Sequence, residues 1–110
     1  MAETFKILGQ VACTSAAVRY IPYAVPAATQ TTISSFLACN LTAATINFRL
    51  SVHAAGATIV NAQYLYYDTI IPAKDTFAGT LGVTLGATDE VRIKVSAATV
   101  ALNLYGVEKT

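Results

Sequence analysis

The feature that most constrains this chain is a strict alternation of apolar and polar residues over positions 45–53. Successive side chains of a β-strand point to opposite faces, so this pattern predicts a half-buried strand of an antiparallel sheet. The residues expected in the core are Ile46, Phe48, Leu50 and Val52, and those expected to face solvent are Asn47, Arg49, Ser51 and His53.

Seven further segments predict strands, at residues 5–12, 20–25, 31–39, 63–71, 76–83, 91–96 and 100–105. Turn residues separate them at intervals of roughly ten positions, and no helical stripe of useful length appears. Pro22 and Pro26 flank the end of the second segment, which suits an edge strand or its exit, because proline cannot donate to a sheet ladder. The short link Ala97-Ala98-Thr99 predicts a hairpin between the last two segments.

The predicted fold is therefore all-β: an antiparallel β-sandwich, jelly-roll-like, of about eight short strands. A chain of 110 residues has the size of one domain, so we expect a single sandwich domain over 1–110. Residues 1–4 and 108–110 are candidates for terminal arms.

Only 12% of the residues are charged, about half the usual share. Since interface cores are depleted in charge, this favours faces covered by neighbours over a merely uncharged, solvated surface. The net charge of +1 gives little repulsion between copies. Lys and Arg are scattered, which argues against direct nucleic-acid binding. Residues 20–48 lack charge, but prolines and polar residues interrupt them, so no membrane span is expected.

The two cysteines, Cys13 and Cys39, form no CxxC pair. The first ten residues lack the basic and apolar regions of a signal peptide. We therefore expect synthesis in a reducing host cytoplasm, with both thiols free and buried.

Several segments resemble, in the same order along the chain, a group of small structural proteins of tailed bacteriophages. They are Phe5-Lys6-Ile7-Leu8-Gly9-Gln10, Tyr23-Ala24-Val25-Pro26-Ala27, Cys39-Asn40, Phe48-Arg49-Leu50-Ser51-Val52, Tyr64-Leu65-Tyr66-Tyr67-Asp68, Ile71-Pro72-Ala73-Lys74-Asp75, residues 85–91, and Tyr105-Gly106-Val107-Glu108. The resemblance covers nearly the whole chain. It implies a β-sandwich component of the virion, without a catalytic motif.

Within that group the resemblance implies a capsid cement or decoration protein, bound at the joints between capsomers. Its partners would be copies of itself, as a dimer or trimer, and the major capsid protein or other virion proteins. The alternative is a tail, baseplate or fibre component of the same particle.

No group of residues predicts catalysis, a cofactor or a metal site. The lone histidine, His53, has neither a nucleophile motif nor an orienting acid, and an exposed position at a strand end is expected for it. Asp75 and Asp89 lie in predicted turns, where aspartate bonds its own backbone. Asp68 could pair with an outward arginine or bond across an interface, and the sequence leaves both open. We therefore expect a protein that is not an enzyme.

The tyrosines at 64, 66 and 67 are the clearest local enrichment. On a regular strand, Tyr64 and Tyr66 share one face, and Tyr67 takes the other with Leu65. Three interpretations stay open: cross-strand packing, an interface anchor, or a sugar-binding platform, the last of which would make the chain a carbohydrate-binding module. The candidate interface residues are Tyr64, Tyr66, Tyr67 and Arg49.

Overall fold

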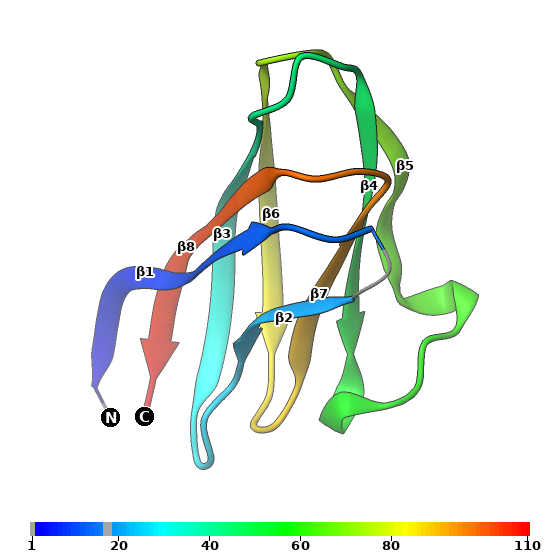
Figure 1. Ribbon diagram of the computed structural model, residues 1–110. Coiled ribbons are helices and arrows are strands. Elements are labelled where there is room, and N and C mark those ends of the chain that lie inside the picture. The colour runs from blue at the N-terminus through cyan, green and yellow to red at the C-terminus, as the bar shows by residue number, and fades with distance from the viewer. Residues whose placement is uncertain (1, 17–18) are drawn as a thin grey trace.

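The computed structural model describes residues 2–16 and 19–110 and shows two packed antiparallel sheets of four strands each (Figure 1). The all-β prediction is confirmed. One sheet has the order β1-β8-β3-β6 and the other β2-β7-β4-β5. The elements are β1 (Glu3–Cys13), β2 (Tyr20–Ala24), β3 (Gln30–Asn40), β4 (Ile46–His53), the short helical turns η1 (Ala54–Gly56) and η2 (Asn61–Gln63), β5 (Tyr64–Ile71), β6 (Thr76–Leu85), β7 (Glu90–Val95) and β8 (Val100–Lys109).

Successive strands alternate between the two sheets, except that β4 and β5 are neighbours in one sheet. An eight-stranded double sheet wound in this way is a jelly roll. The predicted hairpin between the last two strands is wrong, because β7 pairs with β2 and β4 whereas β8 pairs with β1 and β3. The link after β7 instead carries the chain from one sheet to the other. The expected edge position of the proline-containing strand is confirmed, since β2 ends its sheet.

The two chain ends lie side by side (Figure 1). Glu3 is opposite Lys109 in the ladder between β1 and β8. Beyond them, the Ala2 amide donates to the Thr110 carbonyl at 3.1 Å, and the Thr110 amide donates to the Ala2 carbonyl at 2.9 Å. Residues 2–4 and 108–110 of the candidate terminal arms are thus paired with each other as a continuation of the sheet, and Met1 lies outside the described residues.

An aromatic cluster closes the core where β3 and β6 face β4 and β5. It consists of Phe36, Phe48, Tyr66 and Phe77, one from each of these strands, with ring centroids between 5.3 and 6.0 Å apart. Phe36 and Phe48 are fully buried. Gly79 on β6 leaves room for this packing, since a Cβ there would lie 2.3 Å from Cε1 of Phe36.

Bulges bend the sheet β1-β8-β3-β6 along one line. Leu8 is an extra residue between the pairs that Ile7 and Gly9 make with β8, and Ser34 is an extra residue of β3. Opposite Ser34, β6 inserts Leu81 and Gly82, and Gly82 has a φ of 66°, a conformation that favours glycine. Because a bulge bends its strand and increases the local twist, three aligned bulges curve this sheet.

Candidate interaction surfaces

A polar cluster lies on the outer face of the sheet β2-β7-β4-β5. Arg49 lies between two core residues of β4 and points outward. It donates two hydrogen bonds to the carboxylate of Asp68 on β5, from Nε at 2.6 Å and from one terminal nitrogen at 3.1 Å. The guanidinium also lies 4.1 Å from the ring centroid of Tyr67, within cation–π distance. Tyr64 meets Tyr67 edge-on, with centroids 4.8 Å apart.

Two irregularities in β5 build this cluster. Tyr66 pairs with Leu50 and Tyr64 with Ser51, so Leu65 is an extra residue. Asp68, with a φ of 51°, lies in a second irregularity opposite Arg49. The predicted common face for Tyr64 and Tyr66 is therefore wrong: Tyr66 joins the core cluster, and Tyr64 lies outside with Tyr67. Of the four candidate interface residues, the structure brings Tyr64, Tyr67 and Arg49 together and places Tyr66 apart.

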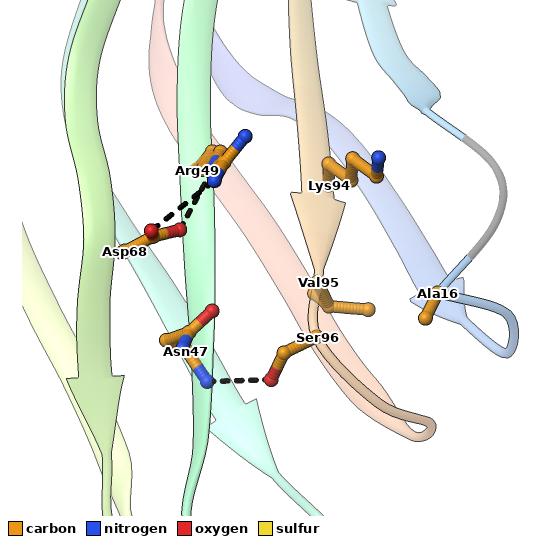
Figure 2. Close-up of a pocket in the computed structure, with 7 residues that line it drawn as sticks. All are labelled: Ala16, Asn47, Arg49, Asp68, Lys94, Val95 and Ser96. Carbon is orange, nitrogen blue, oxygen red and sulfur yellow. Dashed lines mark hydrogen bonds and ion pairs between the residues drawn. The ribbon is translucent and has the colours of Figure 1, made fainter.

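The pairing of Asp68 with an outward arginine, one of the two expected alternatives, is confirmed. The hydrogen bonds from Arg49 hold the pKa of the Asp68 carboxyl below its usual value, and the same bonds raise the pKa of the guanidinium. A shallow pocket of about 240 Å³ lies beside the pair, lined by Ala16, Asn47, Arg49, Asp68, Lys94, Val95 and Ser96 (Figure 2). Arg49 and Asp68 already satisfy each other, so Lys94 is the lining residue whose charge is left to offer a ligand.

The lone histidine is buried, which corrects the expected exposed position. Ser51 and His53 do lie on the outer face of β4, but both have 0% exposure, because the loop between β4 and β5 folds over them. Nδ1 of His53 lies 2.7 Å from the Ala57 carbonyl oxygen and therefore donates to it, while Nε2 lies 2.8 Å from the Ser51 hydroxyl. Val52, expected in the core, is only partly buried at its edge.

Two neighbouring side chains hold the same loop. Arg92 donates to the Gly56 carbonyl at 3.1 Å and to Glu90 at 2.7 Å. Asp89 accepts a hydrogen bond from the Ala55 amide at 2.9 Å and another from the Gly86 amide in its own turn at 2.9 Å.

Asp75 likewise bonds the backbone of its own turn, since it accepts a hydrogen bond from the next amide, that of Thr76, at 2.8 Å. The predicted turn-forming role of the two aspartates is confirmed.

The outer face of the sheet β1-β8-β3-β6 differs sharply in character. Its described charged residues are few and lie toward the chain ends: Glu3 and Lys109, which form an ion pair at 3.6 Å, and Lys6, which pairs with Glu108 at 3.1 Å. The remaining side chains are small, hydroxylic, amide or apolar, and Phe5 and Ile7 are 80% and 51% exposed. A groove of about 480 Å³ crosses this face, lined by Phe5, Lys6, Ile7, Thr32, Ser34, Tyr105, Gly106 and Val107. We name this surface the uncharged face.

The uncharged face was not among the predicted interface residues, although the sequence carries a signal for it. The chain has no charged residue over positions 30–40 or 76–85, which became β3 and β6. Two such strands, side by side in one sheet, leave that half of its outer surface without charge. The missing information was which strands are neighbours, because β3 and β6 are far apart in the sequence.

A polar cluster closes the end of the sandwich near the chain termini. The Tyr23 hydroxyl donates to Glu108 at 2.5 Å and lies 2.8 Å from the Thr31 hydroxyl. Lys6 donates to the other Glu108 oxygen at 3.1 Å. The bond from Tyr23 is the main reason that the pKa of Glu108 is lowered, and burial followed by that bond raises the pKa of Tyr23 to about 12.

Both cysteines are free, as expected, but only Cys13 is buried, and Cys39 is partly exposed. Burial raises the pKa of the Cys13 thiol to about 11. Within residues 2–16 and 19–110, no three metal-ligating side chains of the His, Cys, Asp and Glu types come together. In the same residues, no helix has the length and apolar character to cross a membrane.

These features define an eight-stranded jelly-roll sandwich with one charged and one uncharged face. No protein-family model and no curated protein sequence matches the chain. Solved structures that share its fold include the Drosophila NLP core, which is described for pentamer formation and histone binding. Its TM-score is 0.54, and its sequence is 13% identical over 97% of this chain and 99% of that chain. Another is a chain of infectious bursal disease virus, Gx strain, with a TM-score of 0.57 and 12% identity over 97% of this chain and 32% of that chain.

This chain therefore spans about a third of the viral chain it matches. Identities of 12% and 13% show a common fold and carry no function with them.

Proposed function

We propose that this chain is a non-enzymatic structural component of a virus particle, a cement or decoration protein on the capsid of a tailed bacteriophage. The observation that carries the proposal is the uncharged face, which has the composition of an interface core rather than of a solvated surface. The ordered resemblance to virion proteins of tailed phages supports it. So does the jelly-roll fold shared with a chain of infectious bursal disease virus.

In this role the uncharged face docks on the capsid shell across the joint between capsomers. The molecule measures 45 by 27 Å along its two longer axes, so one sheet face offers more than the roughly 800 Å² per partner of a standard interface. Phe5 and Ile7 supply apolar area to be buried, and the groove beside them can accept a side chain of the shell. The added contact area resists the outward pressure of packaged DNA.

The absence of an enzymatic role is supported by the position of the residues that resemble a catalytic pair. Ser51 and His53 are within hydrogen-bond distance, but both are fully buried beneath the loop. A nucleophile has to reach its substrate, and this serine is covered on the face to which it points. The pair therefore serves to hold the loop.

Binding to particles that lack this protein tests the proposal. Purified chain is added to particles of the encoding phage from which the gene has been deleted, and bound protein is measured after sedimentation. Ile7→Lys places a charge on the uncharged face and is expected to weaken binding at least about tenfold, since a buried charge without a partner is costly. Ile21→Lys is the matched control, because Ile7 and Ile21 are both 51% exposed and Ile21 lies on an edge strand of the other sheet.

Wild-type protein that fails to bind these particles would remove the proposal. Equal binding by wild type and Ile7→Lys would show that another surface docks. The copy number separates the capsid role from a tail, baseplate or fibre role, because hundreds of copies per particle indicate the shell and a few to dozens indicate the tail.

Two other roles have less support. A sugar platform needs an open aromatic face, and Arg49 already lies over one face of the Tyr67 ring. Histone binding, described for the Drosophila relative in fold, calls for an acidic partner surface. This chain has six carboxylates and a net charge of +1.

A further inference from the structure

The free edge of β6 differs from the other three edges of the sandwich. An unprotected edge strand pairs readily with a strand of another chain, and proteins block this with proline, charge or bulges. β2 contains Pro22. β5 carries Asp68 at a positive φ, and β1 carries Glu3 and Lys6 together with the bulge at Leu8.

β6 has none of these protections over residues 76–80. It pairs with β3 along one side, and no strand in the described part of the chain pairs with the other side. The segment Thr76-Phe77-Ala78-Gly79-Thr80 contains neither charge nor proline, and the bulge at Leu81 and Gly82 comes only after it. The carboxylate of Asp75, just before the strand, accepts a hydrogen bond from the Thr76 amide.

We propose that two copies of this chain pair through the free edges of β6, antiparallel about a two-fold axis at Ala78, to form one continuous eight-stranded sheet. An isologous contact of this kind uses the same patch on both copies, so the segment has to be complementary to itself. The docking of the uncharged face described above is a separate contact, and neither requires the other.

The five residues meet that requirement. With Ala78 opposite Ala78 of the second copy, Thr76 lies opposite Thr80 and Phe77 opposite Gly79. Threonine pairs are favourable cross-strand neighbours on the outer face. On the inner face each half-buried Phe77 ring meets a position without a side chain, and an aromatic ring across from a strand glycine is a stabilising arrangement.

Gly79 cannot supply a competing side chain, because the Phe36 ring already occupies that space. The second copy's Phe77 would therefore extend the aromatic cluster of the first. With a net charge of +1 per copy and no charge in the segment, electrostatic repulsion does not oppose the pairing.

Charge swapping at Ala78 tests the proposal, with sedimentation equilibrium over a concentration series as the readout. Ala78 is exposed, so lysine or glutamate fits the folded chain. In Ala78→Lys or Ala78→Glu alone, two like charges lie directly opposite, and we expect dimerisation to weaken at least about tenfold. An equimolar mixture of the two variants is expected to restore a dimer. Ala12→Lys, at an exposed alanine of β1 in the same sheet, is the matched control and is expected to dimerise as wild type does.

A wild-type chain that stays monomeric at all concentrations overturns the proposal, as does a dimer that Ala78→Lys leaves unchanged. If a variant does not fold by circular dichroism, hydrogen exchange of wild type decides instead, since the outward amides of residues 76–80 must become protected as concentration rises.

Particle binding keeps the two proposals apart. A monomeric wild type that binds particles refutes the edge pairing alone, and a dimer that binds no particle refutes the virion role alone.

Discussion

Gly79→Ala tests the packing of the aromatic cluster. A Cβ at residue 79 would lie 2.3, 2.8 and 3.0 Å from three carbons of the Phe36 ring, closer than real contacts allow. The ring cannot turn aside easily, because it is fully buried and packs against Phe48, Tyr66 and Phe77. Overpacking of this kind costs about 1–3 kcal/mol, a large part of the roughly 5–15 kcal/mol that stabilises a domain of this size.

The cause can be isolated with a double-mutant cycle. Phe36→Leu removes Cε1 and Cζ, the two ring carbons that lie nearest the new methyl group, and costs less than the about 3–5 kcal/mol of a Phe→Ala change. In that background Gly79→Ala should cost close to nothing, so the two substitutions should couple by about 1–3 kcal/mol. Urea unfolding monitored by circular dichroism gives the four free energies of unfolding.

Gly82→Ala is the control for the backbone. Gly82 has a φ of 66° and open space where a Cβ would lie. Alanine there should cost about 1–2 kcal/mol through conformation alone, with either residue at position 36. Additive costs for Gly79→Ala and Phe36→Leu, within about 0.5 kcal/mol, would refute the packing argument.

Three further predictions concern polar and thiol groups. The lowered pKa of Glu108 contributes stability above the ordinary glutamate pKa, and that stability is lost as the pH falls through the lowered value. The raised pKa of Tyr23 contributes stability below the ordinary tyrosine pKa, and that stability is lost as the pH rises toward about 12. Tyr23→Phe should therefore flatten both limbs of a plot of unfolding free energy against pH, and two unchanged limbs would contradict the assignment. His53→Leu should cost about 1–3 kcal/mol, because it leaves the Ala57 carbonyl unpaired and Ser51 with only its long bond to the Arg92 carbonyl at 3.5 Å. It should also speed proteolysis of the loop over residues 54–63, and cleavage at the wild-type rate would show that the histidine does not hold this loop. In the native protein a thiol reagent at pH 8 should modify Cys39 and reach Cys13 only after unfolding, so early loss of both thiols would contradict the burial of Cys13.

The strands could be predicted because their signal is local. Burial of one face imposes period two, so residues 45–53 and 91–96 show their strands directly in the sequence. The connection between β7 and β8 could not be predicted in this way. A link of three residues suits a hairpin as well as a crossing between sheets. Which of the two forms depends on the strands with which β7 and β8 pair.

The candidate site was predictable only in part, because bulges and loops change what alternation implies. Arg49 was expected to face outward, and it does. The alternation did not say which face Tyr67 would take, and the structure places Tyr67 outside. The extra residue Leu65 reverses the relation between Tyr64 and Tyr66, and a single inserted residue leaves no mark in composition. His53 lies on the expected face, but its burial depends on a loop that follows it in the chain and folds back over it.

The unequal distribution of charged residues over the two sheets indicates which face docks in the proposed role. Arg49, Asp68, Arg92 and Lys94 lie on the outer face of β2-β7-β4-β5. The described charges of the uncharged face lie toward the chain ends and are Glu3, Lys6 and Lys109. Binding through the charged face would desolvate Arg49 and Asp68, which already satisfy each other, and would gain little in return. Binding through the uncharged face removes apolar area from water and leaves the Arg49–Asp68 and Arg92–Glu90 ion pairs hydrated. A protein oriented in this way presents its charged sheet to solvent, and the assembled particle keeps a polar exterior.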